Sequence, residues 1–440
     1  MGLHSAALRG NDGGSKISRA AKHQEGNPLR VNKHLVVLLA SLFVVSIGFG
    51  ITLPVLPFYA ERLAMEAGAS HKMMVVHVGL LTGVFSLMQL LFAPLWGRLS
   101  DRAGRRPILL LGMAGYGVAH LLFGMATSLW LLYGARILGG ILASATIPAA
   151  TAYVADATSD KKRGRGMAWL GAAVSLGAVA GPALGGLTAW RSLHLYSRFG
   201  HFMIDSFSIP FFAAAALTFL TLLVAFRWLP ESLPSHAESA SRASVFTDWR
   251  NLGRKIGPLL GLSVLSQLGL ALFETVFVLY AQAKLGYGPV QVGLAFMVCG
   301  AVMALFQGLA VGYLSGRASE RIQLAVGFSL MGVGIALLLL VRAQPLVFGT
   351  IGLLALGMAF ISPTLSSLTS KQSGSQTGAA LGLQNAANNL GQVVGPLLGG
   401  ALFAWKAGAP YFLTSASLLV VATFIAWHSH KRLATQSLVP

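Results

Sequence analysis

The chain has 440 residues, of which 55% are hydrophobic and only 10% are charged. A soluble globular protein carries about 25% charged residues, so this composition excludes an ordinary water-soluble domain and indicates a lipid-facing exterior, where an isolated charge is expensive. The formal net charge of +19 would by itself suit nucleic-acid binding, but its distribution along the chain favours another explanation.

The N-terminal segment is polar. Residues 1–33 contain six Lys or Arg side chains and a run of Gly, Asn and Asp. They lack the apolar core and the small-residue cleavage site of a signal peptide. We therefore expect a disordered cytoplasmic tail, and we expect the first apolar stretch to remain as an uncleaved anchor.

Twelve apolar stretches follow, and a helix needs roughly 20 such residues to cross a bilayer. They predict an all-α membrane protein with 12 transmembrane helices in two halves, residues 34–229 and 258–428. A central cytoplasmic loop (230–257) would join the halves, and a cytoplasmic tail (429–440) would end the chain. The predicted spans are Leu35–Phe58, Met73–Leu95, Pro107–Ala126, Ser128–Val154, Arg165–Trp190, Ile209–Trp228, Pro258–Tyr280, Val290–Leu314, Ile322–Val341, Leu346–Leu368, Thr377–Trp405 and Pro410–Trp427.

The basic residues lie mainly on one side of these spans. With the N-terminus in the cytoplasm, 24 of the 32 Lys and Arg residues are cytoplasmic, 7 are on the other side, and Arg136 is inside span four. This positive-inside asymmetry predicts that both termini are cytoplasmic. The charge is then an insertion signal and an attraction for anionic lipid, and no nucleic-acid partner is expected.

Spans two and three are joined by Gly97-Arg-Leu-Ser-Asp-Arg-Ala-Gly-Arg-Arg106. Its glycines predict a tight turn with close backbone approach or positive φ. Asp101 could pair with Arg105, or it could cap the first turn of span eleven, where the helix dipole favours an anion. The alternative is a topological charge cluster without a gating role. The residues of this candidate gating loop are Gly97, Asp101, Arg102, Gly104, Arg105 and Arg106.

Span five carries four glycines and a proline within ten residues. The proline would bend the helix by removing a backbone hydrogen bond, and the glycines would let it pack tightly, plausibly against the other half. Ordinary close packing without a special role is the alternative. The residues are Gly177, Gly181, Pro182, Gly185 and Gly186.

Glu274 is the one acidic residue that we place well inside a span. Intramembrane acids are functional candidates by default, and burial raises the pKa of a carboxylate toward neutral pH, as a proton carrier requires. Gln267, two turns earlier, and Phe277, one turn later, could line a cavity beside it. A structural hydrogen bond from Glu274 to a neighbouring span is the alternative.

Other predicted spans contain the uncharged amide side chains of Gln and Asn. Gln384, Asn388 and Gln392 recur every four residues in span eleven and share one stripe of the helix. Such amides either join helices or face water, and we interpret this stripe as cavity lining. Gln89 in span two and Gln307 in span eight are weaker candidates for the same role.

The two halves repeat each other. Pro148 in span four returns as Pro363 in span ten, 215 residues later, and Gly97–Arg102 returns as Gly312–Arg317 at the same offset. The Gly-x-x-x-Gly-Pro-x-x-Gly-Gly pattern of span five recurs in span eleven. This indicates a duplicated six-helix unit, with a substrate site at the interface of the halves and alternating access by rocking.

These motifs make the chain resemble the major facilitator superfamily, in particular its twelve-helix drug:proton antiporters such as bacterial quinolone and multidrug efflux pumps. The loop 97–106 matches the signature Gly-x-Leu-x-Asp-Arg-x-Gly-Arg-Lys, which implies a latch of the outward-open state. The span-five pattern is similar to the motif of the antiporters. Arg136 falls where Arg-x-x-Gln-Gly places its arginine, but Gly139 replaces the glutamine, so a role of Arg136 in proton transfer stays open beside a structural one. Val45 stands where tetracycline-type relatives have an acid, which argues against a metal–tetracycline substrate.

The sequence therefore predicts a secondary active transporter and not an enzyme. It would be a proton-coupled antiporter, a monomer in a bacterial inner membrane, that exports small amphipathic drugs, cations among them, with Glu274 and Arg136 in proton coupling. No nucleotide-binding loop, metal-ligand cluster or nucleophile motif is present in the sequence, so we expect no cofactor and no metal. Two alternatives stay open: export of one dedicated metabolite, such as a sugar, amino acid or siderophore, and a sensor or scaffold that transports nothing.

Overall fold

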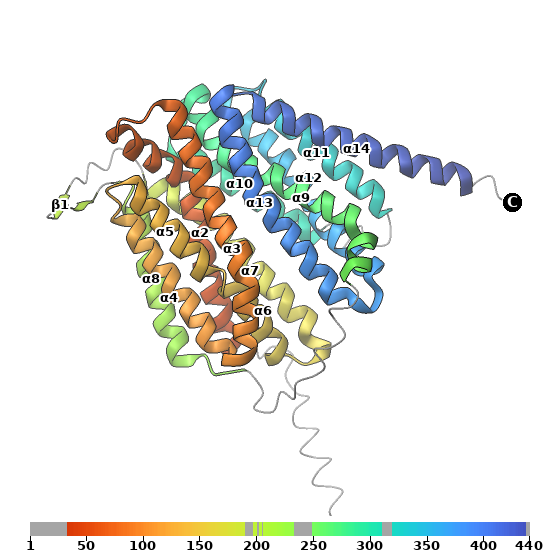
Figure 1. Ribbon diagram of the computed structural model, residues 1–440, viewed down its shortest axis with the longest axis horizontal. Coiled ribbons are helices and arrows are strands. Elements are labelled where there is room, and N and C mark those ends of the chain that lie inside the picture. The colour runs from red at the N-terminus through yellow and green to blue at the C-terminus, as the bar shows by residue number, and fades with distance from the viewer. Residues whose placement is uncertain are drawn as a thin grey trace, which may run out of the picture.

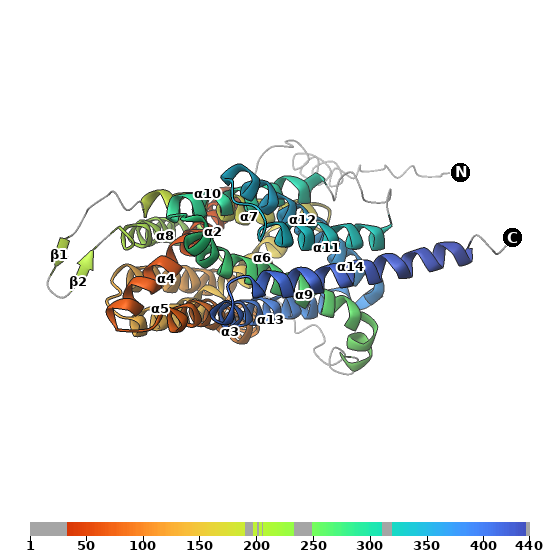
Figure 2. The same cartoon turned by 90° about the horizontal axis from the view of Figure 1, so that it is seen from above.

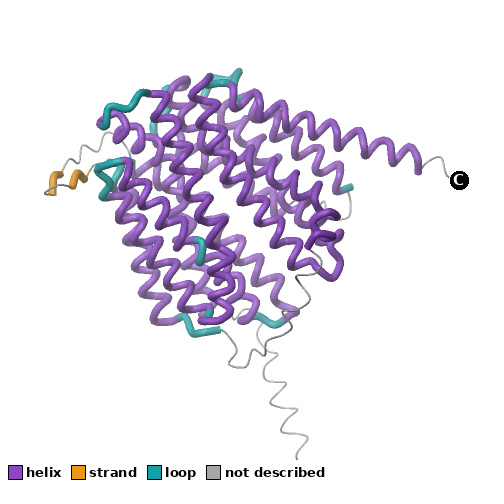
Figure 3. The backbone as a smooth tube through the Cα atoms, in the orientation of Figure 1, coloured by secondary structure: helices purple, strands orange, loops and turns teal. Residues whose placement is uncertain are grey.

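The computed structural model is helical in nearly all of its described residues (Figure 3). A short antiparallel hairpin of β1 (Ser197–Phe199) and β2 (Phe202–Ile204) is the exception within this part of the chain. The N-terminal segment 1–32 and the repeat Gly312–Arg317 fall outside the described residues. The structure describes residues 33–189, 197–199, 202–204, 206–232, 249–309 and 319–436.

Six spans form the N-terminal half. The fourth span consists of two helices, because α5 ends before Pro148 and α6 carries this proline in its first turn, where the missing N–H breaks no helical hydrogen bond. The equivalent Pro363 lies inside a continuous helix, so this part of the repeat is not symmetric. The helices are α2 (Lys33–Glu66), α3 (His71–Ala103), α4 (Arg105–Gly124), α5 (Leu129–Ala143), α6 (Thr146–Ala157), α7 (Asp160–Thr188) and α8 (Ile209–Trp228).

The C-terminal half supplies six more spans, and the predicted count of twelve is confirmed. Eleven helical segments of the described residues are long and apolar enough to cross a membrane, and α13, with 29 residues, is the twelfth although its amides lower its hydropathy. The elements are α9 (Trp249–Tyr280), the π-helix η1 (Ala281–Leu285), α10 (Pro289–Leu309), α11 (Glu320–Leu337), α12 (Gln344–Ser373), the 3₁₀ turn η3 (Gly374–Gln376), α13 (Thr377–Trp405) and α14 (Ala409–Gln436).

Several helices run beyond the apolar stretches that predicted them. Helix α2 continues eight residues past Phe58 to Glu66, α9 begins at Trp249 inside the predicted central loop, and α14 continues to Gln436 inside the predicted C-terminal tail. The reason is that hydropathy detects only the part of a helix that lies in lipid, whereas the backbone hydrogen bonds of a helix can continue into water.

The two halves lie side by side and meet along two pairs of helices. Figure 2 shows α3 beside α13 at one edge of the interface and α7 beside α10 at the other. We call the end of the molecule where α2 ends and α3 begins the Glu61 face, and the opposite end the terminal face. Helices α3 and α13 cross near the Glu61 face and separate toward the terminal face (Figure 1).

Close contact between the halves is concentrated toward the Glu61 face. A Cβ atom added to Gly79 of α3 would lie 2.6 Å from the carbonyl oxygen of Pro396 in α13. At the other edge, a Cβ atom added to Gly186 of α7 would lie 2.5 Å from the carbonyl oxygen of Pro289 in α10. Both are backbone-to-backbone approaches that only glycine allows. Toward the terminal face the same helices are apart, and Gly382 of α13 has no neighbouring atom within 4 Å of its Cβ position.

Candidate functional site

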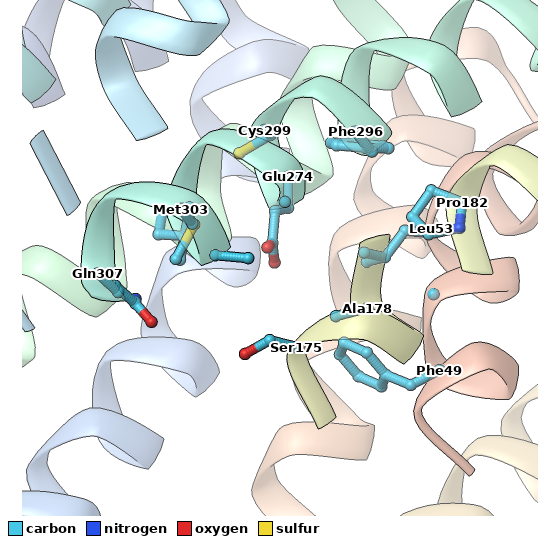
Figure 4. Close-up of a pocket in the computed structure, with 14 residues that line it drawn as sticks. Phe49, Leu53, Ser175, Ala178, Pro182, Glu274, Phe296, Cys299, Met303 and Gln307 are labelled. Atoms are coloured by element: carbon cyan, nitrogen blue, oxygen red, sulfur yellow. The ribbon is translucent and has the colours of Figure 1, made fainter. Parts of the chain in front are cut away.

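A cavity of about 160 Å³ lies between the halves (Figure 4). Two helices of each half surround it, which is the arrangement that the internal repeat predicts for a substrate site. Its wall is mainly apolar, with a carboxyl, a hydroxyl and an amide among its side chains. The lining residues are Phe49, Gly50 and Leu53 of α2, Ser175, Ala178 and Pro182 of α7, Leu270 and Glu274 of α9, and Phe296, Cys299, Gly300, Met303, Ala304 and Gln307 of α10.

Glu274 directs its carboxylate into this cavity, and Ser175 lines the cavity from the opposite half (Figure 4). Helix α9 fixes this orientation, because the flanking Phe273 and Thr275 are buried on other sides of the helix, 0% and 4% exposed. Among the described residues, the Glu274 carboxylate has no hydrogen-bond or ion-pair partner. A half-buried carboxylate without a partner in an apolar cavity can bind a cationic group.

The aromatic wall of the cavity is Phe296 and Phe49, not Phe277 as predicted. Phe277 is fully buried behind the wall, with its ring centroid 5.3 Å from that of Phe273 and 5.8 Å from that of Phe296. The spacing of one helical turn from Glu274 placed Phe277 on the correct side of α9, but neighbouring α10 covers it. Phe277 therefore supports Phe296, which is the ring that a substrate would touch.

Of the six amides predicted to line the cavity, Gln307 does so. Gln392 of α13 instead donates to the Oε1 atom of Gln267 in α9 at 3.4 Å, and Gln384 donates to the Ser366 hydroxyl at 3.4 Å. Asn388 and Gln89 are half-buried and are not part of the lining. The stripe on α13 therefore joins helices through Gln384 and Gln392, which was the alternative that the sequence left open.

Arg136 is buried in the N-terminal half, 5% exposed, and does not line the cavity. Its guanidinium carbon lies 5.1 Å from the ring centroid of Phe85 and 5.4 Å from that of Phe123. Its Nε atom has no hydrogen-bond partner within the described residues. The ring centroid of Phe85 is in turn 6.1 Å from that of Phe49. Arg136 is therefore connected to the cavity wall indirectly, by contacts through Phe85 and Phe49.

The loop between α3 and α4 is a compact ion-pair network of the N-terminal half. Arg105 pairs with Asp101, and its Nε atom donates to Asp156 at 3.0 Å. The Glu231 carboxylate caps α4, because the backbone N–H groups of Arg105 and Arg106 donate to it at 2.8 and 3.2 Å. The prediction that Asp101 pairs with Arg105 is confirmed. The alternative, a cap of Asp101 on span eleven, is not among the hydrogen bonds of the described residues.

The other residues of the loop differ from the predicted turn. The Arg106 guanidinium donates to the carbonyl of Phe226 at 2.7 Å, and Arg102 is exposed in the last turn of α3. The turn itself is the single residue Gly104, at φ 104° and ψ 156°. Gly97 is helical with open space around it, so its predicted part in the turn is wrong.

These two glycines make a matched test of the turn. Gly104→Ala should lower the free energy of unfolding by about 1–3 kcal/mol, because this backbone region is essentially restricted to glycine and the new Cβ would lie 2.5 Å from the Glu231 carboxylate. Gly97→Ala should leave stability unchanged or raise it by up to about 1 kcal/mol. The thermal unfolding midpoints of the two purified variants in detergent would measure this, and equal midpoints would contradict it.

The span-five motif serves two contacts. Gly177, Gly181 and Gly185 lie against the α2 backbone between Phe43 and Ile51, within the same half. Gly186 faces α10 of the other half. Packing across the interface, as predicted, thus involves Gly186 and the Pro182 carbonyl oxygen, which a Cβ atom added to Gly293 of α10 would meet. Gly177, Gly181 and Gly185 pack α7 on α2, the helix that supplies the Phe49 wall.

Comparison with known proteins places these features in a family. The sequence model of the Major Facilitator Superfamily matches residues 38–375 and, in a second match, 259–437. The chain belongs to the Major Facilitator Superfamily. It is therefore a transporter and not an enzyme, an integral multi-pass protein of the bacterial inner membrane, and small molecules are its substrates.

Similar proteins include drug-resistance proteins of bacteria. The chain is 28% identical to Multidrug resistance protein 2 of Bacillus subtilis (strain 168) over 411 residues, which are 90% of this chain and 95% of that protein. It is 32% identical to the class B tetracycline resistance protein of Escherichia coli over 374 residues, 84% and 88% of the two chains. The crystal structure of the human organic anion transporter MFSD10 (TETRAN) is similar with a TM-score of 0.64 at 25% identity, covering 91% of this chain and 99% of that one.

Several features of the site had no signal in the sequence. Three lining residues lie in apolar stretches whose pattern does not distinguish a lipid-facing side chain from a packed one: Phe49, Ser175 and Met303. They come together in one cavity only when the two halves assemble. Cys299 is buried, 5% exposed, in the cavity wall. Within the described residues, no group of three His, Cys, Asp or Glu side chains could hold a metal ion.

Proposed function

We propose that the protein is a proton-coupled antiporter that exports small amphipathic drugs, cations among them, as a monomer in the lipid bilayer. The observation that carries this proposal is the unpartnered Glu274 carboxylate in an apolar cavity shared by both halves. The apolar wall suits the hydrophobic part of a ligand, and the carboxylate suits its positive charge. The resistance functions named for the bacterial relatives support export of drugs.

Coupling would follow from competition for one group. The Glu274 carboxylate binds either a proton or the cationic centre of a substrate, because a second positive charge there would remain unpaired in an apolar cavity. With the terminal face in the cytoplasm, Glu274 loses its proton and binds substrate in the conformation described here. In the opposite conformation a proton from outside displaces the substrate, so that one proton moves inward for each cation exported. Mutual exclusion of this kind is a negative coupling free energy between the two ligands.

The N-terminal half would shape the cavity wall and would not supply a second acidic side chain. Val45, which stands where tetracycline-type relatives have an acid, packs beside Phe85, Tyr116 and Ala143 in an apolar cluster. An apolar side chain there cannot help to bind a metal–tetracycline complex. Arg136 would keep the N-terminal wall positioned through Phe85, and it would keep a second cation out of this half by repulsion.

Proton flux in liposomes tests this function. Purified protein would be reconstituted with an interior pH dye and an acid-outside gradient, and lipophilic cations, quinolones, magnesium–tetracycline and sugars would be added singly. Proton movement with several unrelated cations is the expected result. A response to one polar metabolite alone would establish the dedicated exporter instead, and no response to any compound would support a protein that transports nothing.

A further inference from the structure

A polar contact joins the two halves between the cavity and the Glu61 face. The side-chain amide of Gln282, in η1, donates to the carboxylate of Glu61, near the end of α2, at 2.5 Å. One partner belongs to the N-terminal half and the other to the C-terminal half, 221 positions apart. The bond is partly buried, and a hydrogen bond to an ionised group is stronger than one between neutral groups.

The position of this bond relative to the cavity follows from helix geometry. Glu61 lies eight residues after Leu53 of the cavity wall, and Gln282 lies eight residues after Glu274. At 1.5 Å per residue, both are about 12 Å nearer the Glu61 face than the cavity. The intervening side chains are buried and apolar, among them Val55 and Val278, both 0% exposed. The bond and these apolar side chains therefore separate the cavity from the Glu61 face.

The π-helix explains how Gln282 reaches the interface. Helix α9 is α-helical up to Tyr280 and then continues as the five-residue π-helix η1, which ends at Gly286 with φ 68°. A π turn changes the direction in which the following side chains point, and such turns are frequent at functional sites. The two glycine contacts between the halves, Gly79 against α13 and Gly186 against α10, also bring the halves together toward this face.

We propose that Glu61 and Gln282 form the gate of the Glu61 face, and that breaking the hydrogen bond between them opens it. The ionised carboxylate holds the amide and keeps the face closed. A neutral acceptor would form a weaker hydrogen bond, so removal of the charge at position 61 favours the open conformation in which Glu274 can exchange substrate for a proton. This inference rests on the proposed proton-coupled cycle, and Glu61 is a gating residue in it, not a substrate ligand.

Other charged groups on the elements that meet here make contacts of their own. Arg62 is 3.7 Å from Glu66, and its guanidinium lies over the Tyr59 ring, with 4.9 Å to the centroid. Arg342 donates to the carbonyl of Lys284 at 3.3 Å. The titratable and charged side chains at this face are Tyr59, Arg62 and Glu66 on α2, His71, Lys72 and His77 on α3, Tyr133 on α5, Tyr280 on α9, Lys284 on η1, Tyr287 before α10, Arg342 before α12, Lys406 after α13 and Tyr411 on α14.

Distance measurement across the interface tests the gate without any transport. Met65 and Leu346, 64% and 59% exposed on opposite halves at this face, would be changed to cysteine in a Cys299→Ala background and spin-labelled. Distance distributions of the parent protein and of Glu61→Gln would be compared at the same neutral pH. We expect the long-distance population to be about fivefold larger in Glu61→Gln, the ratio that about 1 kcal/mol of hydrogen-bond energy gives.

Two further variants separate the gate from a general effect of charge. Gln282→Leu removes the donor and should show the same increase as Glu61→Gln. Glu66→Gln, which removes a nearby exposed carboxylate, should behave like the parent protein. Unchanged distances in Glu61→Gln and Gln282→Leu would overturn the gate. If the gate responds as expected but liposomes show no proton flux, the proposed antiport fails and the gate stands.

Discussion

Glu274→Gln should abolish uphill export while leaving downhill exchange of substrate between the two sides of a membrane. The amide keeps the size and the hydrogen-bonding capacity of the side chain but cannot release a proton. Since no other acidic side chain lines the cavity, no described residue of the cavity can replace it. The steady-state accumulation ratio of a lipophilic cation in acid-outside liposomes should therefore fall to about 1.

The affinity for substrate should change with charge. A cationic substrate loses its ion partner and should bind about 5–150-fold more weakly, corresponding to the 1–3 kcal/mol typical of such coupling. A neutral amphipathic compound should bind to Glu274→Gln as tightly as to the parent protein. Binding to detergent-solubilised protein, measured by fluorescence quenching at several pH values, would show a pH dependence for the parent protein and none for the variant.

A matched control is the removal of another carboxylate. Glu66→Gln changes the charge by the same amount at an exposed position far from the cavity lining. It should leave the accumulation ratio unaltered. Uphill export that persists in Glu274→Gln would show that a different group carries the proton, and Glu274 would then be a structural residue.

The sequence predicted the architecture well because the constraints on a membrane span are strong. Each span must satisfy its backbone hydrogen bonds internally, and apolar stretches of the required length therefore give all twelve. The repeat of the glycine motif predicted the pseudo-symmetry, which the structure shows in the equivalent contacts of Gly79 with α13 and of Gly293 with α7. Glu274 was identified because a lone acid in a span is costly unless it has a function.

Cavity composition could not be predicted in the same way. Whether an apolar side chain of a span faces lipid, a neighbouring helix or the cavity depends on how the halves are oriented, and spacing along one helix does not determine this. Phe277 is behind the wall and Phe296 is in it for this reason. Likewise, Glu61 was outside the predicted first span, and Gln282 points across the interface only because the helix changes to a π turn.

Closure of the Glu61 face should fail when either glycine contact between the halves is filled. In Gly79→Ala the new Cβ would lie 2.6 Å from the Pro396 carbonyl oxygen, and in Gly293→Ala it would meet the Pro182 carbonyl oxygen and lie 3.1 Å from Gly186 Cα. Backbone atoms cannot move aside as a flexible side chain can, so we expect a penalty of about 1–3 kcal/mol on this conformation. The transport rate should fall by about 5–150-fold, because a cycle needs both conformations.

The control for this experiment is Gly352→Ala on α12, where the nearest atom to the new Cβ is 3.8 Å away. It should transport at the parent rate. The spin-label pair at Met65 and Leu346 should show a longer distance in Gly79→Ala and Gly293→Ala and not in Gly352→Ala. If the halves rock about their pseudo-symmetry axis, both contacts open together and the two variants should have equal effects. A large effect from one variant alone would mean that the other edge is the hinge, and the rocking motion would then be a rotation about that edge.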